Sequence, residues 1–263
     1  MNIQNLTGLI LLIVVCWAGP ITVAILLKNR FSLPLRIFFI SAAFYLLTLA
    51  VQLPIFYLLI HPWFHRPHNP LVYLVVTAGI FAISEEGSRY LSWRAGTSMR
   101  ENRNWNGALL AGLGYGEAQA FVHALGLPLE VLVALVAPQI FPVNSSFPPG
   151  FTGVLLFYPL FRLYGIEILH CVLTFILNLF YAQLSVLAYG RSVIFLLLVI
   201  GIHWIINVWS MSIPTWSQPA GYISRIVLVI ACLVIIFSMR KVNSGNNRRA
   251  ISRGRRNKWV IGV

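Results

Sequence analysis

Acidic side chains are scarce in this sequence. The 263 residues include six glutamates and no aspartate, and charged residues make up only 10% of a chain that is 59% hydrophobic. Soluble domains carry about 25% charged residues, and no water-soluble fold of this length could bury so much apolar surface. The composition therefore predicts an integral membrane protein. Because charges inside a membrane are costly, each glutamate within an apolar run is a candidate functional residue.

Cysteine is also rare, which excludes a disulfide framework. The three cysteines, Cys16, Cys171 and Cys232, are far apart, odd in number and set in apolar stretches. They form no CxxC spacing, so we interpret them as small core residues.

The charge balance is strongly basic, with a formal net charge of +13. The basic residues lie in short loops and in the segment 240–263, so they do not predict a nucleic-acid partner. They indicate membrane topology and a flexible tail that faces anionic membrane lipids.

Long apolar runs predict an all-α integral membrane protein with seven transmembrane helices. A helix that spans the bilayer needs about 20 mostly apolar residues. The expected spans are 5–27, 36–60, 71–93, 106–130, 152–188, 192–213 and 219–239. The chain then divides into one membrane domain, 1–239, and a basic cytoplasmic tail, 240–263.

The loop charges predict the orientation of this bundle. Basic residues follow the first, third and fifth spans (Lys28, Arg30, Arg36, Arg94, Arg100, Arg103 and Arg191), and eight more lie in the tail. The opposite loops contain only Arg66. The positive-inside rule then places the N-terminus outside and the C-terminus in the cytoplasm. We expect a multi-pass protein of the cell membrane.

The third predicted span carries an unusual polar group, EEGSR. Glu85 and Glu86 lie four and three residues before Arg89, so one helix face can hold both carboxylates beside the guanidinium. Glu85 lies nine residues inside the boundary marked by Arg94, a depth of about 13 Å. At that depth a carboxylate must face the bundle interior or a water-filled cavity. Two adjacent glutamates would also tend to divide acid and base roles.

Three further spans carry polar side chains, and those of spans four and six lie at a depth comparable with that of Glu85. In span four, Glu117 follows a GxxxG face made by Gly112 and Gly116, which allows close approach of another helix. Span five carries Glu167 and His170, three residues apart.

Span six carries His203 and Asn207, four residues apart on one face. The carboxylates of spans three and four therefore converge with a histidine and an asparagine of span six. Span five is too long for the bilayer, so we expect it either to tilt and extend into the cytoplasm or to break near Asn178.

These motifs resemble a family of membrane enzymes. The EExxR group, the GLGYG helix, a later membrane histidine and a final HxxxN together resemble the CAAX-prenyl-protease and bacteriocin-processing superfamily of intramembrane proteases. The segments EEGSRYLSW and WNGALLAGLGYGEAQA are most similar to its YhfC branch. The seven-span layout and the two late histidines also resemble the APH family, the catalytically silent scaffold subunit of gamma-secretase. The resemblance covers spans three to six, and the rest only by topology.

The resemblance implies hydrolysis of a peptide bond in a membrane-embedded or lipidated substrate. A glutamate-activated water would attack the bond, with Glu85 or Glu86 as general base and Arg89 orienting them. This division makes chemical sense, because a base is needed beside the attacking water and donors beside the developing charge.

The resemblance also implies roles for the later polar residues. His170 and His203 would polarise the carbonyl or hold a divalent metal such as zinc, with Glu86 as a further candidate ligand. Asn207 would help to stabilise the oxyanion. The spacing of these residues matches no dedicated zinc motif such as HExxH.

Span four departs from the pattern of the branch. Gln119 stands where its glutamate falls, Glu117 lies two residues earlier, and Tyr115 stands at an expected histidine. A shift of two residues is about 200° around a helix, so Glu117 cannot replace that glutamate without rotation.

Two other functions remain open at this stage. A non-catalytic scaffold would use the polar cluster and the GxxxG face to pack partner transmembrane helices. A proton-coupled transporter would use the buried glutamates and histidines as a relay, although the sequence shows no inverted repeat.

Overall fold

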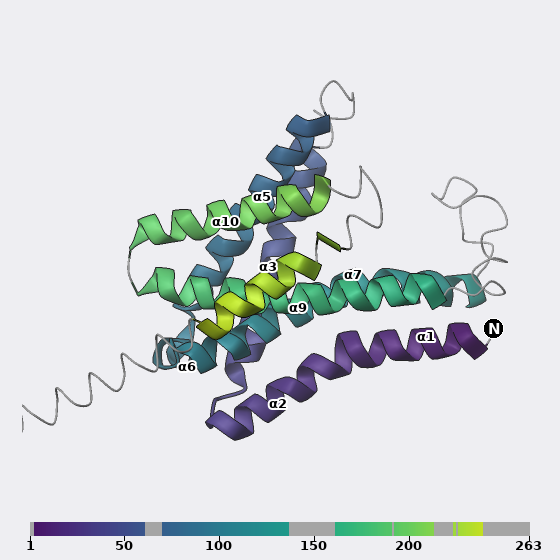
Figure 1. The fold of residues 1–263 in the computed structure, drawn as a ribbon, viewed down its shortest axis with the longest axis horizontal. Coiled ribbons are helices and arrows are strands. Elements are labelled where there is room, and N and C mark those ends of the chain that lie inside the picture. The colour runs from purple at the N-terminus through teal and green to yellow at the C-terminus, as the bar shows by residue number, and fades with distance from the viewer. Residues whose placement is uncertain are drawn as a thin grey trace, which may run out of the picture.

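The computed structural model describes residues 3–60, 70–136, 161–190, 192–212, 223–224 and 226–238, and within these ranges it contains helices and no strand. Figure 1 shows the arrangement. The elements are α1 (Ile3–Ile13), η1 (Val14–Ala18), α2 (Gly19–Phe31), α3 (Arg36–Pro54), η2 (Ile55–Ile60), α5 (Pro70–Ser92), α6 (Gly96–Glu101), α7 (Trp105–Val136), α9 (Phe161–Tyr189) and α10 (Val193–Ser212). A shorter apolar helix, Ile226–Ser238, follows and is called the C-terminal helix below.

Five helical stretches are long and apolar enough to cross a membrane. They are Ile10–Phe31, Arg36–Leu58, Leu71–Ser92, Ile168–Tyr189 and Val193–Ser210. This result agrees with the predicted all-helical, multi-pass membrane protein. The fourth predicted span overlaps α7, and the seventh overlaps the C-terminal helix. The seven-span count remains a prediction.

The helix ends agree with the loop pattern of the sequence. In Figure 1 the junctions between α2 and α3, around α6, and between α9 and α10 all lie toward the left side of the molecule. The N-terminus lies on the opposite side. The predicted basic loops after the first, third and fifth spans therefore share one end of the bundle.

Two π-helical segments lie next to prolines. η1 ends just before Pro20, and the N–H of Gly19 bonds to the carbonyl of Val14. η2 directly follows Pro54, the last residue of α3. Proline lacks an N–H and its ring crowds the preceding turn, so it disturbs the regular hydrogen-bond ladder at these positions.

Helix α7 packs closely on both sides through its glycines. A Cβ atom added at Gly112 would lie 2.8 Å from the carbonyl oxygen of Asn178 on α9, and one at Gly116 would lie 3.1 Å from the Asn178 side chain. On the other side, a Cβ at Gly114 would clash with the carbonyl oxygen of Phe38 on α3. The predicted GxxxG face is therefore occupied by a helix of the same chain.

The fifth predicted span forms one uninterrupted helix over its described part. α9 continues through Asn178, so of the two expected alternatives the break near that residue is excluded. Its 29 residues make a helix about 43 Å long, which exceeds the roughly 30 Å hydrocarbon core. Residues 151–160 lie outside the described part of the chain.

Helix α10 lies against α5 at a glycine. A Cβ at Gly79 would lie 3.4 Å from Nε1 of Trp204, and that indole N–H donates to the carbonyl oxygen of Val75 at 2.9 Å. The neighbouring His203 is thereby fixed toward α5. The other face of α10 is apolar and exposed, as at Ile194, Leu197 and Ile205, which suits contact with lipid.

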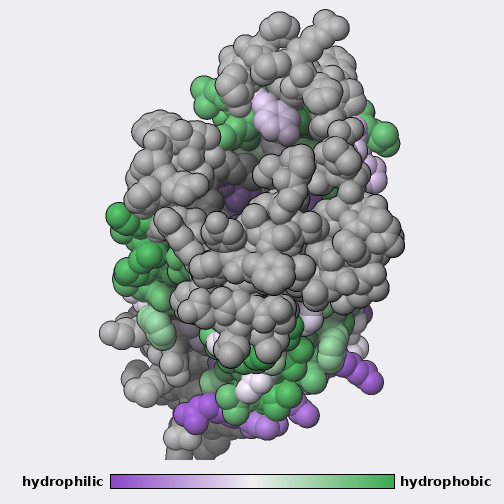
Figure 2. Space-filling view, turned by 90° about the vertical axis from the view of Figure 1, so that its right-hand side faces the viewer, coloured by the Kyte–Doolittle hydropathy of each residue, from purple (hydrophilic) through white to green (hydrophobic). Residues whose placement is uncertain are grey.

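The surface separates apolar from hydrophilic residues. In Figure 2 hydrophobic residues cover the flanks, while hydrophilic residues gather along the lower rim. The three cysteines are buried and form no disulfide, as predicted.

Candidate functional site

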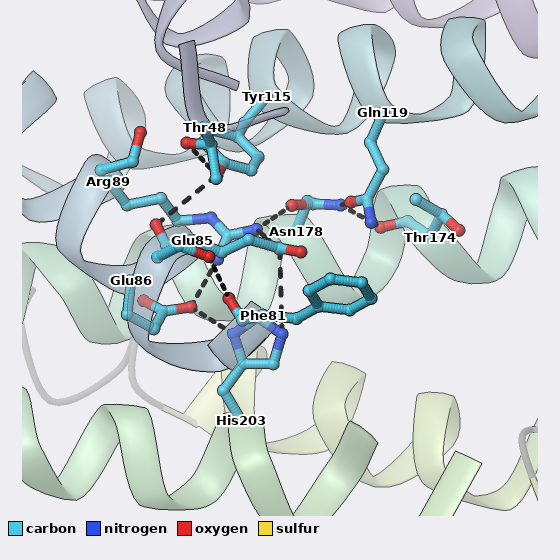
Figure 3. A network of polar contacts seen from close by, with 12 residues as sticks. Thr48, Phe81, Glu85, Glu86, Arg89, Tyr115, Gln119, Thr174, Asn178 and His203 are labelled. Atoms are coloured by element: carbon cyan, nitrogen blue, oxygen red, sulfur yellow. Dashed lines mark hydrogen bonds and ion pairs between the residues drawn. The ribbon is translucent and has the colours of Figure 1, made fainter. Parts of the chain in front are cut away.

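Arg89 holds both glutamates of α5 in one buried ion-pair group (Figure 3). Its Nη1 donates to Oε1 of Glu86 at 2.5 Å, and its Nη2 donates to Oε2 of Glu85 at 3.2 Å. The spacings of three and four residues on one helix produce this geometry, as predicted from the sequence.

The guanidinium of Arg89 is also enclosed by aromatic rings. Its central carbon lies 4.0 Å from the ring centroid of Tyr115 on α7 and 5.2 Å from that of Tyr181 on α9. The hydroxyl of Tyr115 donates to Oγ1 of Thr48 on α3 at 3.2 Å. Tyr115 of α7 therefore packs against Arg89 of α5 and bonds to Thr48 of α3, so its side chain connects three helices.

His203 connects α10 to both glutamates. Its Nδ1 lies 2.7 Å from Oε1 of Glu86, and its Nε2 lies 3.8 Å from Oε2 of Glu85. Its ring stacks on Tyr181 with a centroid separation of 3.9 Å and an interplanar angle of 15°. Because Glu86 is bonded to Nδ1, the second ring nitrogen is oriented toward Glu85.

Asn178 is a member of the network that the sequence analysis did not single out as functional. Its Oδ1 accepts a hydrogen bond from Arg89, and its amide donates to Oε1 of Gln119 at 2.8 Å and to the carbonyl oxygen of Thr174 at 2.8 Å. Its polarity within an apolar helix was the available signal. In the sequence, Asn178 marks only the place where a break of span five is one of two alternatives.

A cavity of about 530 Å³ lies beside this network. Its walls come from α3, η2, α5, α7, α9, α10 and the C-terminal helix, and most of them are apolar. The polar part of the wall includes Glu85, Arg89, Gln119, Asn178 and His203. The cavity is therefore a largely apolar chamber with one polar side, as is common for small-molecule and substrate sites.

The two glutamates relate differently to this cavity. Glu85 lines it, and its side chain is 8% exposed. Glu86 does not line it, and its side chain is 0% exposed. Only Glu85 can present a carboxylate oxygen to a molecule in the cavity. Glu86 contacts Arg89 and His203 from the side that faces away from the cavity.

The other predicted site residues are divided between the cavity and the remainder of the bundle. His170, Asn207 and Gln119 line the cavity. Glu117 does not. It lies on α7 one turn before Phe121, which packs against Trp17 of η1 at a centroid separation of 5.0 Å, so its face of α7 meets the first helices of the chain.

Glu117 and Gln119 therefore have different roles in the structure. Gln119 contacts the network through Asn178. Glu117 is 8% exposed, and its Oε2 has no hydrogen-bond partner within the described part of the chain. Glu167, which the sequence places three residues before His170 on span five, has its side chain outside the described residues.

The donor set does not fit a metal centre. Over the described ranges, no group of three or more His, Cys, Asp and Glu side chains is arranged to hold a metal ion. Of the predicted ligands, Glu86 is engaged by Arg89 and His203, and His170 lies on another wall of the cavity.

Two carboxylates, one guanidinium and the His203 ring share this buried network. Such an arrangement stabilises buried charges only when all partners remain in place. Oε2 of Glu86 and Nε of Arg89 are nonetheless buried without a hydrogen-bond partner among the described residues.

No family model, no curated protein and no solved structure matches this chain.

Proposed function

We propose that this protein is an intramembrane peptidase that uses Glu85 to activate a water molecule. The main support for this proposal is the position of Glu85 on the polar wall of a largely apolar cavity. Its Oε2 lies 3.8 Å from Nε2 of His203. Separations beyond about 3.5 Å commonly accommodate a bridging water.

The chemistry assigned to these residues is a general acid–base hydrolysis. Glu85 accepts a proton from water as the water oxygen attacks the carbonyl carbon of the peptide bond. His203 and Asn207 donate hydrogen bonds to the developing oxyanion. Glu85 then returns the proton to the leaving amine, so that one water is consumed and two termini are formed.

Glu86 and Arg89 act as positioning residues in this proposal. Glu86 accepts from Nδ1 of His203, which directs the other ring nitrogen into the reaction zone. Arg89 fixes both carboxylates and is itself fixed by Asn178. The arrangement resembles the orienting carboxylate of a catalytic triad.

The motif order supports an assignment to the CAAX-protease and bacteriocin-processing superfamily, near its YhfC branch. The seven-span topology, with the N-terminus outside and the tail in the cytoplasm of a cell-membrane protein, belongs to the same proposal. The grouping of the loop ends on one side in Figure 1 supports it.

The scaffold alternative loses one of its arguments. It relied on the GxxxG face to receive a partner helix, and that face packs on α9 within the chain. The transporter alternative has no specific support beyond the buried charges themselves.

The proposal is tested by cleavage of a pooled library of membrane-anchored peptides in liposomes prepared in ¹⁸O-labelled water. We expect the purified protein to release products whose new carboxyl group carries one ¹⁸O atom. We expect Glu85→Gln and His203→Ala to abolish these products. Cleavage that survives both substitutions would refute the site, and wild-type protein that cleaves no peptide would favour the scaffold.

A further inference from the structure

A second polar cluster lies at the loop end of the bundle, outside the cavity. Tyr189, the last residue of α9, has two arginines near its ring. The guanidinium carbon of Arg103 lies 3.9 Å from the ring centroid, and that of Arg94 lies 5.8 Å from it. Tyr90 packs beside Tyr189 with a centroid separation of 5.2 Å. We call these four residues the arginine–tyrosine cluster.

Both arginines are positioned by hydrogen bonds that use only some of their N–H donors. Arg103 donates through Nε and Nη2 to the carbonyl oxygen of Trp93, at 3.2 and 2.8 Å, which uses two of its five N–H donors. Arg94 donates to the hydroxyl of Tyr90 at 3.4 Å and is exposed. That hydrogen bond raises the pKa of Arg94, so its guanidinium stays charged.

Neither arginine has a carboxylate partner among the residues that the structure describes. Among the residues that the structure describes, the ion pairs involve Arg89 and His203 and not Arg94 or Arg103. Two positive charges around one ring repel each other, and no described carboxylate lies within ion-pair distance of either. An external anion with several oxygen acceptors would relieve that repulsion and accept their free N–H groups.

The position of the cluster points to a lipid as the source of that anion. Tyr189 ends one candidate span, Ile168–Tyr189, and Arg94 lies two residues after the end of another, Leu71–Ser92. The cluster is therefore at the depth of the lipid headgroups, where tyrosine is enriched. Leu91, one turn before Arg94, is 53% exposed and offers apolar surface to an acyl chain.

We propose that the arginine–tyrosine cluster binds the headgroup phosphate of an anionic phospholipid. The phosphate oxygens accept hydrogen bonds from Arg94 and Arg103, and the acyl chains lie along the exposed apolar flank of α5. This site is separate from the peptidase proposal, because it requires no cleavage and shares no residue with the cavity.

The test measures binding of fluorescent phosphatidylglycerol to the purified full-length protein in detergent micelles. Phosphatidylcholine and inorganic phosphate serve as competitors. We expect phosphatidylglycerol to bind in preference to phosphatidylcholine, and inorganic phosphate not to displace it. Arg94→Gln and Arg103→Gln should each weaken binding by about tenfold, because each removes charge-assisted hydrogen bonds.

Arg100→Gln is the matched control, since Arg100 is an exposed arginine of the same loop region that contacts the backbone of Gly96. Its affinity should equal that of the wild type. Arg94→Gln keeps the test decisive if Arg103→Gln fails to fold, because the exposed Arg94 side chain donates to the Tyr90 hydroxyl, whereas that of Arg103 donates to a backbone carbonyl. Equal loss in Arg100→Gln, unchanged binding in Arg94→Gln, or displacement by inorganic phosphate would overturn the proposal.

Discussion

At the scale of single residues, two adjacent glutamates occupy different environments. One carboxylate, Glu85, borders the cavity, while the other, Glu86, is enclosed between Arg89 and His203. The sequence predicted that both would share a face with Arg89, because helix spacing determines this. It left open which of them would act as the base, since that depends on where α10 places His203.

The difference predicts unequal effects on stability. Glu86→Gln should lower the free energy of unfolding by about 3–5 kcal/mol, because it removes the buried negative charge that both Arg89 and His203 contact. Glu85→Gln should cost about 1 kcal/mol, because its longer 3.2 Å contact with Arg89 can be kept by the amide oxygen. Thermal unfolding in detergent measures both. Equal losses of stability in the two variants would contradict the assignment of Glu86 as the residue that holds Arg89 and His203 in place.

Asn178 gives a second prediction at this scale. Asn178→Leu should lower the free energy of unfolding by about 1–3 kcal/mol, because Arg89 loses an acceptor and Gln119 loses a donor in a buried site. Leu177→Met, a substitution of similar volume on the neighbouring position, is the control and should change stability by less than about 1.5 kcal/mol. Denaturant unfolding of both variants provides the comparison, and a stable Asn178→Leu would show that the network does not depend on this residue.

At the scale of helices, the glycines of α7 determine how closely α3 and α9 approach the site. The small-residue pattern was visible in the sequence, and close helix packing was predicted from it. The partner was not predictable, because a GxxxG face looks the same whether it meets another subunit or a helix of its own chain. Likewise, the length of span five was visible, but only packing against α7 shows that α9 passes straight through Asn178.

Alanine substitutions test this packing. Gly112→Ala and Gly114→Ala should each destabilise the protein by about 1–3 kcal/mol, because the added methyl group would clash with backbone atoms of α9 or α3. Gly87→Ala and Gly201→Ala are the controls, since a Cβ there meets nothing within 4 Å. They should be neutral or stabilising by up to about 1 kcal/mol. Equal behaviour of the two pairs in thermal unfolding would argue against this close packing.

At the scale of the whole molecule, composition and loop charge predicted an all-helical, multi-pass membrane protein, and five apolar helices agree with it. The convergence of spans three and six was also predicted from depth alone, and Glu85 and His203 do meet. The rotation of α7 about its own axis was not predicted, because the depth of a residue in the membrane gives no angle about the helix axis. As a result Gln119, rather than Glu117, contacts the network.

The proposed topology is testable by cysteine labelling. Asn2→Cys and Asn144→Cys should react with a membrane-impermeant maleimide added outside intact cells. Thr97→Cys and Ser252→Cys should react only after permeabilisation. The three native cysteines are buried and should contribute little background. Outside labelling of Thr97→Cys would contradict an external N-terminus followed by seven spans.

The most direct test of the account compares the cleavage rates of Glu85→Gln and His203→Ala with that of Gly87→Ala, using one peptide that the wild type cleaves in liposomes. Removing the general base should lower kcat by about 10²–10⁴-fold, and thermal unfolding should show that Glu85→Gln remains folded. Gly87→Ala should cleave at the wild-type rate. A folded Glu85→Gln protein that retains the wild-type kcat would contradict the claim that this carboxylate activates the water.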